Sequence, residues 1–348
     1  MRVITLSSAG MALALAACSS ENGPTQPEVD DPLGTTSSLV AARNTWTPRA
    51  PRPGVLFETF AGVAKNSAGQ SIVYVFGGTD GEGGTGFGTS AYNVATNTWT
   101  GGLSNVGVFG ANGVGKIGSK LYFSGGYNEV ETPSSFTNAV WAYDYSRDRL
   151  IRKADLPIFG AEGVTGVIKG KLYVLPGACS GDRYPNPGYC AEEPTRRFFR
   201  YDPGTNTWVT RREAPHVHRQ GAAAVIGGKF YVAGGFNGFQ PVTALDVYDP
   251  ATNTWRTLAP LPTGGTARGD VVKGQFFVVV QSFDGTTSVT RAYAYNPKTN
   301  TWKSRAAPQW HHDAVVRVIL DGLAHLLAVG GNRGPDFDAP NDSELYTP

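Results

Sequence analysis

The stretch Tyr248-Asp249-Pro250-Ala251-Thr252-Asn253-Thr254-Trp255 decides the fold, because it places a turn between two large aromatic residues. Pro250 and Asn253 favour a tight reversal of the chain. We therefore expect Tyr248 and Trp255 on neighbouring antiparallel strands of one hairpin.

The same pattern returns along the chain with a period of about 50 residues, which indicates a repeat architecture. A tyrosine opens each copy, and the second copy ends in Leu150 where the others have tryptophan. The tyrosines are Tyr92, Tyr143, Tyr201, Tyr248 and Tyr295, and the tryptophan ends are Asn97-Thr98-Trp99, Asn206-Thr207-Trp208, Asn253-Thr254-Trp255 and Asn300-Thr301-Trp302.

An apolar segment that ends in two glycines precedes most of these tyrosines, as in Lys229-Phe230-Tyr231-Val232-Ala233-Gly234-Gly235. A segment rich in Gly, Ala and Val precedes it in turn, so each unit contains four short strands. A sheet this small cannot bury both of its faces alone, and we expect the units to pack radially into a ring. The glycine pair is replaced by Pro176-Gly177 in the third unit and by Val280-Gln281 in the fifth.

Double glycine, then tyrosine, then tryptophan at this period resembles the kelch repeat. The resemblance extends from about Asn44 to the C-terminus. It implies an all-β fold, a six-bladed kelch-type β-propeller. Small residues suit its crowded inner strands, and the tyrosines and tryptophans suit the wide outer gaps between blades.

The two ends of the chain complement each other. The last unit has Gly330-Gly331 and then Tyr346, but it lacks a tryptophan strand, whereas Asn44-Thr45-Trp46 stands alone near the N-terminus. We expect this N-terminal segment to pair as the outermost strand of the C-terminal blade and to close the ring.

The N-terminus reads as an export signal. A single cation, Arg2, precedes an apolar run that is typical of a secretory signal. Leu15-Ala16-Ala17-Cys18 resembles the bacterial lipobox, which implies lipidation of Cys18. We expect a lipoprotein signal peptide over 1–17, a lipidated flexible tether over 18–42 and the propeller over 43–348. The protein would then be an outer-membrane lipoprotein on the periplasmic or cell-surface side, held to the membrane by its lipid anchor only.

Two cysteines remain after Cys18, and both lie in one loop. An even number of cysteines in an exported chain favours a disulfide between Cys179 and Cys190. A metal pair is the alternative, although that loop contains no histidine and no third cysteine.

Composition limits the function classes. The chain of 348 residues has a net charge of +2 and only 17% charged residues, with no basic stripe. A protein that binds a nucleic-acid backbone usually shows such a stripe, so no nucleic-acid partner is expected.

Polar residues in the segments that connect an outer strand to the next inner strand should meet at the mouth of the central channel. Hydrated channel lining is one interpretation, and a polar ligand pocket with Arg219 and Arg268 as anion clamps is another. A metal site from His218, His311 and His312 is a third, but neighbouring residues on a strand point to opposite faces. The candidates are Glu58, Glu162, His216, His218, Arg219, Arg268, Asp270, Trp310, His311, His312 and Asp313.

Long loops between the second and third strands are expected on the same face, where loops on a rigid scaffold usually carry function. Their aromatic residues would stack on sugars or anchor a protein. These loops include Thr79–Gly88, Tyr127–Asn138, Ala178–Arg196 and Asn332–Asp342, and the loop aromatics are Phe87, Tyr127, Phe136, Tyr184, Tyr189, Phe236, Phe239, Phe283 and Phe337.

No hydrolase, metalloprotease or phosphate-loop motif is found. We therefore expect a binding module that presents its loop face to a protein or a glycan, without a cofactor. The alternative is a carbohydrate-active enzyme, because the resembled family includes periplasmic six-bladed sialic-acid mutarotases. Such an enzyme would use an acid/base and an arginine for the sugar carboxylate, with Glu162, His218, Arg219 and Arg268 as candidates.

Overall fold

The computed structural model describes residues 43–54, 57–78, 88–128, 135–178, 195–283, 286–331 and 342–348. All regular structure in these residues is β-strand, and none of them forms a helix long and apolar enough to cross a membrane. The signal peptide, the tether, Cys18 and the Cys179–Cys190 loop lie outside the described residues, so those expectations stay predictions.

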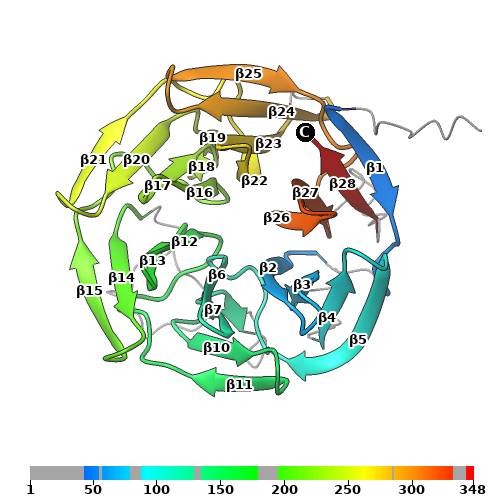
Figure 1. Ribbon diagram of the computed structural model, residues 1–348. Coiled ribbons are helices and arrows are strands. Elements are labelled where there is room, and N and C mark those ends of the chain that lie inside the picture. Colours follow the sequence, from blue (N-terminus) through cyan, green and yellow to red (C-terminus); the bar gives the residue numbers. More distant parts are fainter. Residues whose placement is uncertain are drawn as a thin grey trace, which may run out of the picture. The chain divides into compact units, whose positions relative to one another are not determined.

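Six four-stranded antiparallel sheets, here called blades, stand around a central channel (Figure 1). The first strand of each blade lies nearest the axis, and the last lies at the rim. The strands are β2 (Phe60–Lys65), β3 (Ser71–Phe76), β4 (Gly88–Asn93) and β5 (Thr98–Asn105) in blade 1; β6 (Val114–Ile117), β7 (Lys120–Ser124), β10 (Val140–Asp144) and β11 (Arg149–Arg152) in blade 2; β12 (Val164–Ile168), β13 (Lys171–Leu175), β14 (Phe198–Asp202) and β15 (Thr207–Arg211) in blade 3; β16 (Ala222–Ile226), β17 (Lys229–Ala233), β20 (Leu245–Asp249) and β21 (Thr254–Thr257) in blade 4; β22 (Thr266–Val272), β23 (Gln275–Phe283), β24 (Ser288–Asn296) and β25 (Thr301–Arg305) in blade 5; and β26 (Ala314–Leu320), β27 (Leu323–Val329), β28 (Ser343–Thr347) and β1 (Thr45–Arg49) in blade 6. Two short hairpins, β8 (Tyr127–Asn128) with β9 (Ser135–Phe136) and β18 (Phe236–Asn237) with β19 (Gln240–Pro241), complete the described strands.

The predicted aromatic hairpin is confirmed. Tyr248 on β20 is paired with Trp255 on β21, and the tyrosine is fully buried between blades. The equivalent tyrosine of every blade is at most 2% exposed. Each such ring contributes a large apolar area to the contact between neighbouring blades.

A polar latch fastens each hairpin to the preceding linker. In blade 4 the Tyr248 hydroxyl donates to Oδ1 of Asn253 at 2.8 Å, and the Arg212 N–H donates to the same oxygen at 3.1 Å. The Trp255 indole N–H donates to the Arg212 carbonyl at 2.7 Å. The Tyr-to-Asn (or Asp) bond recurs in all six blades, at Asn97, Asp148, Asn206, Asn253, Asn300 and Asn44, and each acceptor residue has a positive φ of 46° to 57°.

The ring closes as predicted, because β1 pairs with β28 (Figure 1). The register of this pair places Trp46 opposite Tyr346. The Tyr346 hydroxyl donates to Oδ1 of Asn44 at 2.9 Å, and the Trp46 indole donates to the Ala306 carbonyl at 2.8 Å. The latch of blade 6 is thus assembled from residues at opposite ends of the propeller.

Candidate functional site

The central channel contains a cavity of about 1130 Å³ lined by all six inner strands and the segments that enter them. Hydrophobic residues such as Val114 and Val225 line part of it. Polar groups concentrate at the mouth, where the chain enters each inner strand. The described residues therefore combine apolar walls with a few convergent polar groups, as ligand sites commonly do.

A belt of hydrogen bonds around the mouth sets the positions of these polar groups. The Gly110 N–H donates to the Glu58 carbonyl, the Glu162 N–H to the Gly110 carbonyl, and the Gln220 N–H to the Glu162 carbonyl, at 2.7 to 2.9 Å. The four residues have left-handed φ values of 53° to 58°. Arg268 and Asp313 complete the belt, because Nε of Arg268 donates to the Asp313 carbonyl and the Thr59 N–H donates to Oδ2 of Asp313.

Glu162 is the most heavily bonded acid at the mouth. Its carboxylate accepts from Nε of Arg219 and from Nε2 of Gln220, both at 2.5 Å. The hydroxyl of Tyr127 also hydrogen bonds it, while burial raises the pKa of that tyrosine. A carboxylate with this many donors is held in one orientation and acts as a positioning group.

Glu58 differs because its side chain is exposed to the channel and has none of these donors among the described residues. The low-polarity surroundings, and then the charges of Glu162 and Asp313, raise its pKa to about 7. Asp313 is more enclosed, and burial raises its pKa too, against the opposing effect of Arg268. The carboxyl of Glu58 therefore gains and loses a proton near neutrality.

Arg268 and His311 bring the remaining functional groups to the cavity. Nε and Nη1 of Arg268 donate to the carbonyls of Asp313, Gln220 and Ala267, whereas Nη2 has no hydrogen-bond partner among the described residues. Burial, then the charge of Arg268, lowers the pKa of His311 to about 3, so this imidazole is neutral at pH 7. One nitrogen of the Arg268 guanidinium thus stays unbonded within the described residues.

Asp270 also lines the cavity, away from this group. Its carboxylate accepts the N–H groups of Val271 at 2.6 Å and Arg317 at 2.8 Å, and burial raises its pKa. The bond from Arg317 joins the inner strands of blades 5 and 6, which is a structural role.

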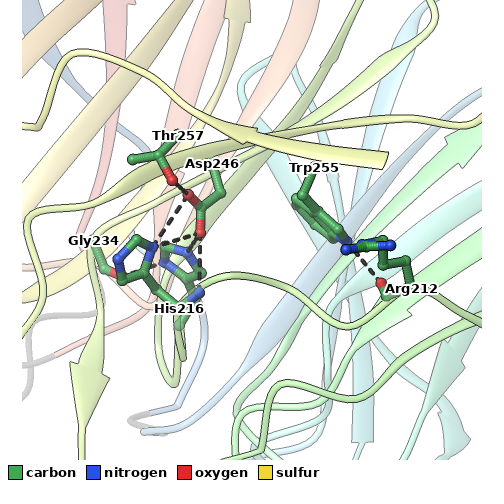
Figure 2. Close-up of polar contacts among 7 residues, drawn as sticks. Arg212, His216, Gly234, Asp246, Trp255 and Thr257 are labelled. Carbon is green, nitrogen blue, oxygen red and sulfur yellow. Dashed lines mark hydrogen bonds and ion pairs between the residues drawn. The ribbon is translucent and has the colours of Figure 1, made fainter. Parts of the chain in front are cut away.

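The structure separates the other histidine candidates from the cavity. His218 is fully buried, with Nδ1 at 2.8 Å from the Gly234 carbonyl and Nε2 at 3.2 Å from Asp246. His216 meets the same carboxylate at 3.0 Å, and the Thr257 hydroxyl donates to it at 2.7 Å (Figure 2). These histidines fasten the linker into blade 4 and do not line the cavity.

Blade 6 repeats this arrangement. His312 lies between the Gly330 carbonyl, at 3.0 Å, and Glu344, at 2.8 Å. Neither His312 nor Trp310 lines the cavity. No group of three or more His, Cys, Asp or Glu residues in the described part of the chain could hold a metal ion.

Sequence reasoning missed Gln220 and placed Tyr127 only among loop aromatics. Gln220 was detectable, because Glu58, Glu162 and Gln220 each stand two residues before an inner strand. Tyr127 was not detectable, because its ring reaches Glu162 only by packing against Gly110. A Cβ at Gly110 would lie 2.9 Å from the Tyr127 ring.

Comparisons with known proteins agree with the repeat. A family model described as Kelch motif matches residues 219–262, which include all four strands of blade 4. The chain is 30% identical over 125 residues to Kelch repeat and BTB domain-containing protein 12 of Homo sapiens, which is 35% of this chain and 19% of the human protein. The Danio rerio protein of the same name is 30% identical over 122 residues, 34% of this chain and 19% of that protein. The chain thus matches only a small part of these curated relatives.

The solved structure titled "Structure of YjhT" superposes with a TM-score of 0.67 at 17% identity, covering 85% of this chain and 95% of that chain. At that identity the likeness shows the fold alone. It agrees with the six-bladed arrangement of the described strands.

Proposed function

We propose that this kelch-repeat β-propeller is a binding module whose ligand is a small acidic sugar held at the mouth of the central channel. The observation that carries the proposal is the convergence of Glu58, Arg268 and His311 on one cavity of about 1130 Å³. A planar guanidinium grips a carboxylate well, and a neutral imidazole and a half-ionised carboxyl suit sugar hydroxyls.

Within the described residues, the polar groups of the channel support a ligand there, whereas most of the long loops on the loop face lie outside these residues. A protein interface usually shows a contiguous apolar patch of several hundred Å². The large exposed hydrophobic residues in the described segments are Val209, Phe239, Phe283 and Leu323, and they belong to blades 3, 4, 5 and 6.

Binding is tested by titration calorimetry with sialic acid, glucuronic acid and a neutral hexose. We expect the acidic sugars to bind, and we expect Arg268→Ala to lower their affinity at least tenfold. Lys303→Ala, which removes an exposed cation from β25, is the matched control and should leave affinity unchanged. Absence of binding by every sugar would contradict the proposal and favour a protein partner.

Catalysis is the second candidate, and the pKa of Glu58 near 7 favours it. A carboxyl group that titrates at the working pH both donates and accepts protons efficiently. An epimerase or mutarotase of an acidic sugar would use Glu58 in that way. Exchange spectroscopy of the two sugar anomers would show faster interconversion with the wild-type protein and a loss of at least a hundredfold with Glu58→Gln. Rates equal to those in buffer would exclude this activity.

The same proposal places the propeller outside the inner membrane, tethered through Cys18. The lipobox-like segment before that cysteine supports it. Incorporation of a labelled fatty acid into the wild-type protein, and its loss in Cys18→Ala, would verify the anchor. Failure of the wild-type protein to incorporate the label would refute it.

A further inference from the structure

Blade 5 has a longer central hairpin than the other blades. β23 and β24 have nine residues each, and their pairing continues to Phe283 opposite Ser288. In blade 4, by contrast, the second strand stops at Ala233, where Gly234 and Gly235 turn the chain with positive φ. Val280 and Gln281 stand in place of that glycine pair, and such residues rarely adopt a positive φ. The strand therefore continues.

This extension brings an aromatic residue to the cavity. Gln281 and Phe283 are two residues apart on β23, so they share a face of the hairpin, and both line the cavity. Ser288, directly opposite Phe283, lines it as well. Phe283 is nevertheless 69% exposed, and of the four large exposed hydrophobic residues in the described segments it is the one at the cavity.

The hairpin holds this aromatic ring on a strand rather than on a loop. Ser282 is paired with Val289, and Nη1 of Arg291 donates to the Ser282 hydroxyl at 2.8 Å. The carbonyl of Gln281 packs against Gly265, where a Cβ would lie 2.1 Å from it. A platform on a paired strand is preorganised, so ordering it on binding costs little.

We propose that Phe283 is a stacking platform that selects ligands in the closed-ring form, and this inference rests on the proposed sugar binding. A pyranose ring has an apolar face of C–H groups, whereas its hydroxyls and carboxylate are polar. Phe283 would cover the apolar face while Arg268 takes the carboxylate. Covering an exposed aromatic ring removes apolar area from water, which strengthens binding.

The experiment compares two acids of equal charge in titrations of the full chain. Glucuronate presents a pyranose ring, and gluconate is an open chain. We expect Phe283→Ala to weaken the binding of glucuronate at least tenfold and the binding of gluconate less than twofold. Phe283→Trp should retain glucuronate affinity within threefold and add a fluorescence change on binding. Phe239→Ala, which removes the 89% exposed aromatic of the β18–β19 hairpin, is the control and should bind as the wild type does.

The outcomes separate the two proposals. Stacking would be overturned if Phe283→Ala lost affinity equally for both acids. It would also be overturned if Phe283→Ala lost no affinity for either acid while Arg268→Ala did. Both results would leave acidic-sugar binding intact. Failure of the wild-type protein to bind sialic acid, glucuronate or gluconate would overturn the proposed function, and stacking with it.

Discussion

Single residues at the channel mouth differ in how many donors reach them. Glu162 accepts bonds from Arg219 and Gln220, and Asp313 accepts two from Thr59, whereas Glu58 faces the channel. Desolvation without compensating donors moves a carboxyl pKa upward. This is why the carboxyl of Glu58, which lacks such donors among the described residues, has its pKa raised to about 7.

The pKa of Glu58, raised from 4.5 to about 7, makes a prediction about stability. Between these values the unfolded chain releases the proton that the folded protein keeps, so folded-state stability falls as pH rises, and it levels off above about pH 7. Glu58→Gln cannot release a proton and should lack this slope. Urea unfolding of both proteins from pH 4.5 to 8 gives the free energy of unfolding at each pH. Parallel plots of this free energy against pH would contradict the raised pKa of Glu58.

At the scale of elements, the hairpin that ends each blade also joins it to the preceding linker. The αL asparagine of the turn accepts from its own tyrosine and from a linker N–H, and the indole N–H returns to the linker carbonyl. Blade 2 has Leu150 in place of the tryptophan, and there the Ser104 hydroxyl donates to the Asp148 carbonyl instead. One short motif therefore serves both the fold of a blade and its attachment to its neighbour.

Asn253 tests the latch. Asn253→Ala removes the oxygen that accepts hydrogen bonds from Tyr248 and Arg212. It also places alanine at a φ of 55°, a left-handed conformation that is strained for alanine. We expect a loss of about 2–4 kcal/mol in the free energy of unfolding. Asn253→Asp should stay close to the wild type, because Asp148 fills this role in blade 2.

Thr252→Ala provides the control for Asn253, because its hydroxyl meets only Thr254 on the exposed turn. Chemical denaturation of the three variants gives the comparison. Equal stabilities of Asn253→Ala and Thr252→Ala would show that the latch contributes nothing.

The whole molecule depends on a contact between its two ends. β1 supplies the outer strand of blade 6, and Trp46 packs on Tyr346 with ring centroids 5.2 Å apart and on Phe277 of blade 5 at 6.2 Å. Each blade of a propeller packs against two neighbours only when the ring is closed, and radial repetition then leaves only short, protected strand edges. Closure therefore couples all six blades.

Deletion of residues 43–50 should abolish cooperative unfolding, because blade 6 loses its outer strand and blade 5 loses its contact with Trp46. Calorimetry would show a broad transition at lower temperature. Trp46→Ala keeps the strand and should remain cooperative, with a loss on the order of 2–4 kcal/mol. An unchanged melt of the deletion variant would refute closure.

The sequence by itself determined the repeat, the four strands of each unit, the number of blades and the complementary ends, because these follow from local turn chemistry and from the period of Tyr248 and its equivalents. It also placed Glu58 and Arg268 near the channel. It did not show that His218 and His312 are enclosed, since their partners Asp246 and Glu344 lie 28 and 32 residues away in sequence.

Only the tertiary structure decided which polar side chains face the cavity. Left-handed backbone at Glu58 and Glu162, held by bonds between neighbouring blades, sets those directions. The tertiary structure also decided the role of Val280-Gln281, which in sequence is only a departure from the glycine pair. Its effect, a strand long enough to bring Phe283 to the channel, depends on where the ring places that hairpin. Local patterns specify strands, whereas the direction of a side chain at a junction depends on contacts between elements that are distant in sequence.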